Sequence, residues 1–203
     1  MGNYDIQPAN PGSAEKIADL IYATDPSVWD YLFDNNRELY ARYISALWEQ
    51  KNNTFAHTEA HVLVSSSGQL QGVELGYTGA NEPQMRQNTY PVIQASLSSG
   101  ERLVLINNAR HIEYLTPFTP SRGYYLHFLS LAPECKGKGF GRVFMEHVFE
   151  RAGSKGCTSV HLDVYKTNPA TQFYQSFGFE VVVELHFPNK PGLPPHYRMA
   201  KSL

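Results

Sequence analysis

The sequence predicts a single mixed α/β domain. Strand-like and helix-like segments are interleaved along the chain, which is typical of such a domain. The chain has 203 residues, which is enough to bury one substantial core. Hydrophobic residues make up 42% of it, so the apolar side chains that this core requires are present.

The N-terminal part of the chain predicts one strand followed by helices. Residues 3–7 have the pattern of a short strand, and a Pro-Gly turn separates them from a helix that starts near Ser13. A second helical region follows Pro26 and continues to Trp48. It carries an apolar stripe at helical spacing, made of Tyr40, Tyr43, Ile44, Leu47 and Trp48.

The middle of the chain predicts a hairpin and then a helical insertion. Two apolar runs, 61–64 and 70–77, flank a Ser/Gly turn and are typical of a β-hairpin. Residues 78–123 follow, and they contain helix-like patterns at 91–97 and 101–115. We therefore expect a helical insertion between the third and fourth strands.

The segment from Tyr124 onward contains the clearest patterns. Residues 124–131 predict a strand, 132–139 a glycine- and lysine-rich turn, and 140–152 a helix. The remaining predicted elements are a strand at 159–165, a short helix at 168–177 that ends at Gly178, and strands at 179–186 and 196–202 joined by a proline-rich loop at 188–195.

The glycine-rich turn predicts a phosphate site. It reads Lys136-Gly137-Lys138-Gly139-Phe140-Gly141-Arg142 and lies between a predicted strand and a predicted helix. A helix N-terminus has unpaired backbone N–H groups and partial positive charge, and glycines let the backbone approach an anion closely. The two lysines and the arginine add charge, so the turn suits phosphate or pyrophosphate.

Two common nucleotide motifs do not fit this turn. A Walker loop requires a glycine, then four residues, then Gly-Lys-Ser/Thr, and the sequence has no such run. The dinucleotide fingerprint Gly-x-Gly-x-x-Gly fails because the third glycine, Gly141, comes one residue early.

Two segments of this region carry a resemblance to a known family. Leu129-Ser130-Leu131-Ala132-Pro133-Glu134 precedes Lys136-x-x-Gly139-x-Gly141, and residues 168–179 contain Asn168, Phe173-Tyr174 and Gly178-Phe179. These segments resemble the Leu-x-Val-x-Pro-Glu, Gln/Arg-x-x-Gly-x-Gly/Ala and Asn-x-x-Ala-x-x-Phe-Tyr-x-x-x-Gly-Phe motifs of the GNAT superfamily of acyl-CoA N-acyltransferases. Lys136 departs from the family's Gln or Arg, which keeps the charge but loses the planar fork of arginine.

The resemblance implies a fold and a cofactor. The expected fold is a central, mixed but mostly antiparallel twisted sheet of about seven strands flanked by helices, in one domain over residues 1–203. Residues 124–182 would form the acetyl-CoA-binding core, and the insertion at 78–123 departs from the family's plan. The residues implied to bind acetyl-CoA are Leu129, Ser130, Leu131, Lys136, Gly137, Lys138, Gly139, Phe140, Gly141, Arg142, Asn168 and Phe173.

The resemblance also implies details of that core. In the family the central strands splay apart beside a bulge, and the pantetheine arm pairs with the exposed backbone edge. Here that edge would be Leu129 to Leu131, and the Leu131 N–H would polarise the thioester carbonyl. Asn168 would contact the pantetheine or its water, although helix capping explains its position as well.

The implied activity is N-acetylation of an amine by direct attack on acetyl-CoA in a ternary complex. Tyr174 occupies the position of the family's general acid, and the alternative is a core aromatic beside Phe173. The alternative function is a catalytically inactive CoA-binding module with a regulatory or sensor role.

The general base is left open between two residues and water. His127 lies on the same predicted strand as Leu129 and Leu131, and regular alternation places the three on one face. A partly buried histidine bonded to a neighbouring strand explains His127 equally well. Glu74, on the second strand of the predicted hairpin, is the other candidate.

Composition limits the partners and the location. A net charge of −2 with scattered cations indicates neither nucleic-acid nor membrane binding. The eight histidines lack metal-ligand spacing, so no metal is predicted. Two cysteines, Cys135 and Cys157, are too few for a disulfide framework and favour the cytoplasm. The expected acceptor is a small-molecule amine or a peptide amino group, and the resemblance allows a homodimer.

Overall fold

A seven-stranded sheet forms the centre of the protein. The computed structural model describes residues 4–187 and 193–203, and its strands run in the order β1-β2-β3-β4-β5-β7-β6. The strands are β1 (Tyr4–Pro8), β2 (Ala60–Ser65), β3 (Leu70–Thr78), β4 (Gly123–Leu131), β5 (Ser159–Tyr165), β6 (Glu180–Leu185) and β7 (His196–Ser202). All neighbours pair antiparallel except β4 and β5, which pair parallel. This confirms the predicted mixed, mostly antiparallel sheet.

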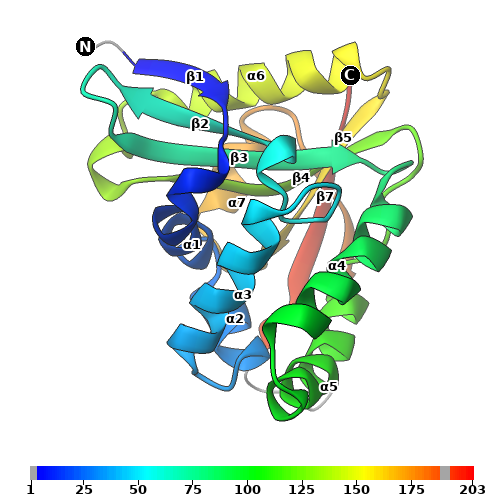
Figure 1. Ribbon diagram of the computed structural model, residues 1–203. Helices are drawn as coiled ribbons and strands as arrows, with labels where there is room; N and C mark the ends of the chain where they lie inside the picture. The colour runs from blue at the N-terminus through cyan, green and yellow to red at the C-terminus, as the bar shows by residue number, and fades with distance from the viewer. Residues whose placement is uncertain (1–3, 188–192) are drawn as a thin grey trace.

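Helices cover both faces of the sheet. Helix α6 (Phe140–Ser154) lies along one face over β3 and β4, and α1 (Ala14–Tyr22) contacts the same two strands from the other face (Figure 1). The remaining helices are α2 (Pro26–Leu32), α3 (Arg37–Glu49), α4 (Glu82–Ser96), α5 (Ser99–Leu115) and α7 (Ala170–Gln175), with short 3₁₀ helices at Pro11–Ser13, His57–Glu59 and Pro133–Cys135.

The helical region predicted from Pro26 to Trp48 is two helices. Asp34 and Asn35 have φ values of 51° and 60°, and this left-handed backbone interrupts the helix between α2 and α3. Asn36 then caps α3 by accepting a hydrogen bond from the Leu39 N–H at 2.9 Å. The sequence pattern predicted the helical content but not this break.

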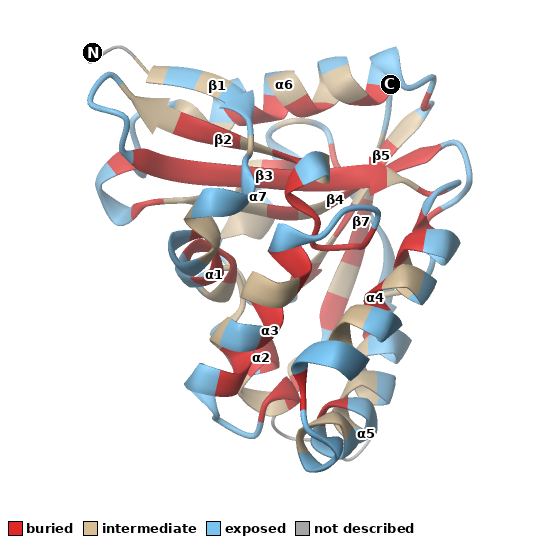
Figure 2. Cartoon of the chain, in the orientation of Figure 1, coloured by how far each residue is buried: buried red, intermediate tan, exposed pale blue. Residues whose placement is uncertain are grey.

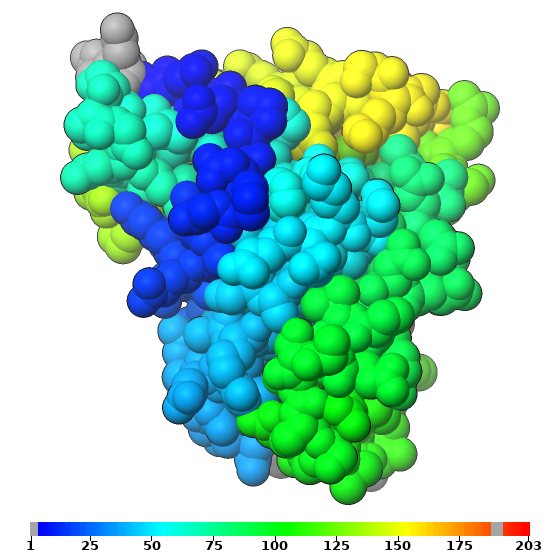
Figure 3. Space-filling model, in the orientation of Figure 1, coloured from blue at the N-terminus to red at the C-terminus, as the bar shows by residue number. Residues whose placement is uncertain are grey.

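The insertion between β3 and β4 is helical, as predicted, and it forms a hairpin of α4 and α5. α4 starts at Glu82 rather than at the predicted Pro91, because Pro83 supplies the first turn and Pro91 is tolerated inside the helix. α5 begins with a capping box in which Ser98 and Glu101 exchange hydrogen bonds. Figure 3 shows the insertion, in green, packed beside the blue and cyan N-terminal helices, and α2–α5 and α3–α4 contacts hold it there.

The buried residues form two clusters, one on each face of the sheet. The larger cluster packs α1, α2 and α3 against the sheet and includes Trp29, Trp48 and Phe128. The smaller cluster packs α6 and α7 against the other side and includes Met145 and Phe179. Figure 2 shows β3 buried along most of its length, whereas α4 and α5 are mostly exposed or intermediate. The insertion is largely exposed, but Met85, Leu97, Leu105 and Leu115 from it belong to the larger cluster.

A β-bulge in β4 changes which face each of its side chains occupies. Leu75 pairs with Phe128 and Gly76 pairs with Leu126, so His127 is the extra residue. His127 and Phe128 consequently stack on the α1–α3 side, with ring centroids 4.0 Å apart, while Leu129 packs with the α6-side cluster. The prediction that His127 shares a face with Leu129 is therefore wrong, because regular alternation stops at the bulge.

Two predictions lie partly outside the described residues. They are the start of the first strand at residue 3 and the proline-rich loop at 188–195. Within the described ranges, no helix combines the length and the apolar character that a bilayer crossing requires.

Candidate active site

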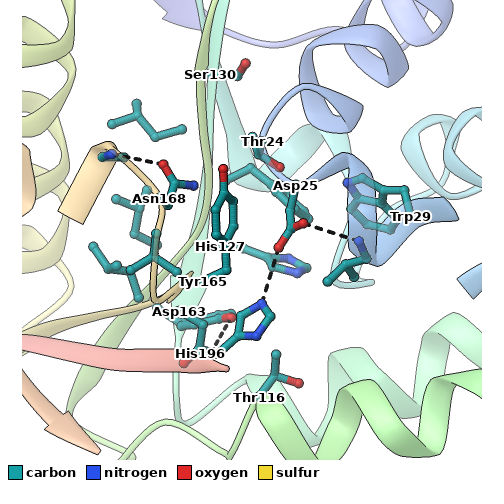
Figure 4. Close-up of a pocket in the computed structure, with 18 of the residues that line it drawn as sticks. Thr24, Asp25, Trp29, Thr116, His127, Ser130, Asp163, Tyr165, Asn168 and His196 are labelled. Carbon is teal, nitrogen blue, oxygen red and sulfur yellow. Dashed lines mark hydrogen bonds and ion pairs between the residues drawn. The ribbon is translucent and has the colours of Figure 1, made fainter. Parts of the chain in front are cut away.

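One large cavity opens where β4 and β5 separate. Its volume is about 1190 Å³, and its walls come from β4, β5, the glycine-rich turn, α7 and the helices α2, α4 and α5 (Figure 4). The turn, the two strands and these helices all contribute lining residues. Chemistry-bearing residues from distant parts of the sequence meet in this single space.

The separation of β4 and β5 leaves part of the β4 backbone unpaired. Parallel pairing with β5 ends at Tyr125, whereas β4 stays paired with β3 as far as Leu131. The Ala132 N–H donates to the Gln71 carbonyl at 2.8 Å, and hydrogen-bonded pairs alternate along antiparallel strands. The amides of Leu131 and Leu129 therefore point away from β3, into the gap.

The turn between β4 and α6 presents free backbone amides. Gly137 and Gly139 have φ values of 73° and 86°, a left-handed conformation that favours glycine. Among the described residues, the amides of Gly137, Lys138 and Gly139 have no hydrogen-bond acceptor. α6 begins at the next residue, and Lys136 and Arg142 line the cavity here. These donors and charges fit a phosphate or diphosphate group.

Most of the residues predicted to bind the cofactor border this cavity. They are Leu129, Ser130, Leu131, Lys136, Gly137, Gly139, Gly141, Arg142, Asn168 and Phe173. Lys138 and Phe140 do not line it. Phe140 packs instead on Tyr4, with ring centroids 4.4 Å apart, because its position at the start of α6 directs the ring toward β1.

Helix α7 brings Tyr174 and Phe173 to the cavity beside Asn168. Gly141 permits this close approach, because a Cβ there would lie 3.1 Å from the Phe173 ring. Tyr174 is buried, and its hydroxyl makes no hydrogen bond within the described residues. Burial raises the pKa of Tyr174 above its ordinary value, so the phenol stays protonated at neutral pH. Asn168 Oδ1 accepts from the Ala170 N–H at 2.9 Å, which leaves its NH₂ group for a ligand.

His127 borders the cavity as a neutral imidazole with a fixed tautomer. Its Nδ1 lies 3.0 Å from the Thr54 carbonyl oxygen, and because a carbonyl only accepts, Nδ1 carries the proton. Nε2 then presents a lone pair. Burial lowers the pKa of His127 to about 3, with a smaller contribution from the charge of Arg86. His127 can thus accept a hydrogen bond but holds a proton weakly.

Glu74 lies away from the cavity, and its prediction as a general base requires correction. Its side chain is fully buried on the α6 face, where Arg151 Nη1 donates to both carboxylate oxygens at 2.9 and 2.6 Å. The Tyr124 hydroxyl donates to the same carboxylate at 3.0 Å. A base must reach the reacting amine, and Glu74 does not line the cavity. Its hydrogen bonds indicate a structural role.

The cavity wall also contains ion pairs that the sequence did not indicate. Arg198 donates to both oxygens of Asp163 at 2.7 Å, and the Tyr125 hydroxyl donates to the same carboxylate at 2.8 Å. Arg86 lines the cavity and donates to the buried Glu82 at 2.6 and 3.0 Å. Each of these charges therefore has an oppositely charged partner.

Asp25 and His196 form a further polar pair in the cavity. Asp25 Oδ1 caps α2 by accepting from the Val28 N–H at 3.2 Å, and its Oδ2 lies 3.3 Å from His196 Nε2 (Figure 4). His196 Nδ1 lies 2.8 Å from the Pro194 carbonyl oxygen. Sequence reasoning missed this pair, because 171 positions separate the two residues and no local spacing indicates it.

A second group of polar residues lies on the α6 face, outside the cavity. The ligand atoms of His61, Glu74 and His147 lie within 4.8 Å of one another, which a metal ion could use. However, Arg151 already binds both oxygens of Glu74, and its charge opposes a cation at this place. These three residues therefore fit a metal ion poorly. The absence of a metal remains a prediction.

Comparisons with known proteins agree with this geometry. The sequence model of the Acetyltransferase (GNAT) family matches residues 25–179. That range includes the glycine-rich turn, both splayed strands and α7. A search of curated proteins found no match.

Several solved structures share the fold over the whole chain. One, described as an acetyltransferase, is 19% identical, with a TM-score of 0.71 and 98% of each chain covered. An N-acetyltransferase from Staphylococcus aureus Mu50 is 15% identical, with a TM-score of 0.73 and coverage of 97% of this chain and 100% of its own. A histone acetyltransferase-related protein from Corynebacterium glutamicum is 19% identical, with a TM-score of 0.64 and coverage of 99% and 96%. At these identities the similarity concerns the fold.

Proposed function

The chain belongs to the Acetyltransferase (GNAT) family, and from this premise we propose that it is an N-acetyltransferase that uses acetyl-CoA and an amine acceptor. Family membership supports acyl transfer in general, and the cavity supports the narrower assignment. The single observation that carries it is that a turn with free amides and the unpaired edge of β4 border one continuous cavity.

The turn and the strand edge have complementary parts in binding coenzyme A. The amides of Gly137 to Gly139, the N-terminus of α6 and the charges of Lys136 and Arg142 would hold the diphosphate. The backbone groups of Leu129 and Leu131 would pair with the amides of the pantetheine arm. The bound cosubstrate supplies a thioester whose acyl carbon an amine can attack.

Two groups of the chain would then assist the transfer. The Leu131 N–H would donate a hydrogen bond to the thioester oxygen as negative charge develops there. As the C–N bond forms and the C–S bond breaks, the Tyr174 hydroxyl would donate a proton to the departing sulfur. The Tyr174 phenol carries its proton at neutral pH, as this role requires, and burial raises its pKa, which makes it a weaker acid than an exposed tyrosine.

His127 is proposed to position the amine. Its Nε2 lone pair would accept a hydrogen bond from the amino group and orient the nitrogen toward the thioester. A pKa of about 3 is too low for His127 to keep the amine's proton, so that proton leaves to water or to another group of the cavity.

The proposed acceptor is a small-molecule amine or a peptide amino group. No nucleic-acid or membrane partner is proposed. Cytoplasmic location and a homodimer remain predictions. Cys135 and Cys157 are both free and buried, which agrees with a reducing compartment.

Two measurements test the proposal together. Calorimetry should detect coenzyme A binding to the purified protein, and thiol release from acetyl-CoA should depend on an added amine. Binding without thiol release over a broad amine panel would favour an inactive CoA-binding module. Failure to bind coenzyme A would contradict the proposal itself.

A further inference from the structure

Aromatic rings surround the proposed position of the acceptor nitrogen. Three of them pack around His127, with centroid separations of 4.0 Å for Phe128, 5.0 Å for Phe55 and 5.7 Å for Tyr77. All four residues line the cavity. Phe55, Tyr77 and Phe128 are buried, so packing fixes their positions. The atoms next to an amino nitrogen held at His127 therefore meet ring carbons.

The helices continue this apolar wall. The lining residues that they contribute include Trp29 from α2, Ile93 from α4, and Leu105, Ala109 and Ile112 from α5. Trp29 packs on Phe55 and Phe128, with centroid separations of 6.2 and 5.8 Å, so α2 directly adjoins the rings around His127. In the view of Figure 4, Trp29 and Asn168 lie on opposite sides of His127.

Part of this wall is open to solvent at the insertion. Tyr90 of α4 and Ile106 of α5 line the cavity, yet they are 54% and 46% exposed. An acceptor thus has a path to the apolar wall between these helices. A bound apolar body would cover these two side chains, which stabilises the complex in proportion to the area removed from water.

Two ion pairs neutralise buried charges of the cavity wall. Arg198 donates to both oxygens of Asp163 at 2.7 Å, and Arg86 donates to Glu82 at 2.6 and 3.0 Å. The side chains of both carboxylates are at most 5% exposed. An acceptor charge that displaced one partner would leave the other buried and unpaired, which is strongly unfavourable.

Asp25 and His196 form a third pair. His196 Nδ1 lies 2.8 Å from the Pro194 carbonyl, and Nε2 lies 3.3 Å from Asp25 Oδ2. Both oxygens accept, so the two hydrogen bonds are made together by an imidazolium. Glu113 also lines the cavity, but it is exposed to water. Among the described lining residues, no buried charge is therefore left to bind a charged acceptor body.

We propose that the acceptor is a primary amine whose attached body is apolar and uncharged. Its nitrogen lies at His127, and its body lies against the surrounding rings and against α2, α4 and α5. An alkyl chain or an aryl ring meets this description, whereas a diamine, an aminoglycoside or a hydrophilic peptide does not. This inference rests on the proposed function, because it names the acceptor class of the same site.

A pair of amines of equal size gives the sharpest test. n-Hexylamine and 1,5-diaminopentane have the same number of non-hydrogen atoms and differ in a terminal methyl or ammonium group. We expect kcat/KM for n-hexylamine to be higher by about tenfold or more, because the wall offers the second ammonium group no free partner. Equal values, or a preference for the diamine through Glu113, would overturn the inference.

The length of the alkyl chain tests the apolar wall separately. From methylamine to n-hexylamine, kcat/KM should rise by about three- to fourfold for each added CH₂ group. These amines have similar basicity, so the trend reports the body and not the nitrogen. Equal kcat/KM values along the series would contradict the inference while leaving the proposed function intact.

Binding of an unreactive analogue distinguishes the two proposals further. n-Hexanol has the same body without the amino group, and calorimetry on the coenzyme A-loaded protein should show it binding about tenfold or more tightly than ethanol. Such binding without turnover of any amine would support the apolar site and contradict the proposed function. Equal binding of the two alcohols would contradict the apolar site.

A substitution in the insertion tests which element selects the acceptor. Ala109→Phe places a ring in the cavity from α5, so kcat/KM for n-hexylamine should fall by about tenfold while that for methylamine changes by less than about twofold. Leu103→Phe is the matched control on α5, because Leu103 is 62% exposed and does not line the cavity. An unchanged Kd for coenzyme A shows that each variant is folded.

Equal losses for both amines in folded Ala109→Phe would contradict the role of the insertion. The comparisons of amines and alcohols on the unmodified protein test the inference even if this variant does not fold.

Discussion

The two faces of the sheet contain matching networks of a tyrosine, a carboxylate and an arginine. The α6-face network consists of Tyr124, Glu74 and Arg151, and the cavity-face network consists of Tyr125, Asp163 and Arg198. The two tyrosines are neighbours on β4 and point to opposite faces, as adjacent residues of a strand do. Both carboxylates are almost completely buried.

The networks differ in what surrounds them. Tyr125 and Asp163 line the cavity, whereas none of the residues of the α6-face network does. A buried carboxylate held by an arginine is therefore not evidence of a catalytic base by itself. The same arrangement occurs on the α6 face, which has no access to the cavity. Position relative to the separation of β4 and β5 decides which groups can act on a substrate.

The largest expected effect is a loss of protein stability when the network on the α6 face is broken. Glu74→Gln leaves the Arg151 charge buried without its counter-ion, which costs about 3 kcal/mol of unfolding free energy. Turnover per folded molecule should stay within about twofold. Chemical denaturation and initial rates at a temperature where the variant is folded measure both quantities. A large loss of turnover at unchanged stability would restore Glu74 as a base and break the comparison.

A smaller effect is expected at the cavity, where we expect a change in turnover rather than in stability. Tyr174→Phe removes the proposed proton donor and should lower kcat by about 100-fold, equivalent to about 2.7 kcal/mol. Stability should change little, because the hydroxyl has no hydrogen-bond partner within the described residues. Tyr124→Phe is the control, since it loses its bond to Glu74 and should cost about 1 kcal/mol of stability with little change in kcat. Equal kcat in Tyr174→Phe and the unmodified protein would remove Tyr174 from the mechanism.

One histidine on each face of the sheet should make the stability of the protein depend on pH. Burial lowers the pKa of His127 to about 3 and, with Arg151, that of His61 to about 4. Below pH about 6.5 the unfolded chain binds protons on these rings that the folded protein does not, so stability falls as the pH falls. Each ring contributes a slope of up to about 1.4 kcal/mol per pH unit.

Single variants separate these two contributions. His127→Gln should remove the contribution of His127 to the slope of unfolding free energy against pH, which extends down to about pH 3. His61→Gln should remove the contribution of His61, which extends only down to about pH 4. Urea denaturation at a series of pH values measures the slopes. A slope that persists unchanged in His127→Gln would show that the ring titrates normally, and His127 would return as a candidate base.

The smallest expected effect is on coenzyme A binding. Gly139→Ala introduces a Cβ at a φ of 86° with open space around it, so it strains the turn by about 1 kcal/mol and should weaken coenzyme A about fivefold. Gly156→Ala is a matched control, with a φ of 72° and open space beyond the end of α6. Both variants should lose similar stability, but only Gly139→Ala should change the calorimetric Kd. Equal Kd values would argue against the turn as the binding site.

The parts of the site that depend on local sequence could be predicted. The turn from Lys136 to Arg142 and the Phe173-Tyr174 pair follow from consecutive residues on known element types, and all of these residues except Lys138 and Phe140 line one cavity. Short apolar runs bounded by turn residues also predicted seven strands, with the ends of most of them shifted by one residue or less.

The parts that depend on register or long-range packing could not. A single extra residue, His127, turns the β4 side chains beyond it to the opposite face, and no local pattern reveals it. Glu74 looked available because its arginine partner lies 77 positions away. The Asp25–His196 pair joins residues from opposite ends of the chain, so only the folded structure brings it into view.

The most direct measurement compares coenzyme A with pantetheine, which has the same arm but lacks the diphosphate and the adenosine 3′-phosphate, by calorimetry on the unmodified protein. If the turn binds the diphosphate, coenzyme A should bind about 100-fold more tightly or better, because several charge-assisted hydrogen bonds are lost in pantetheine. Equal affinities for the two ligands would contradict the account.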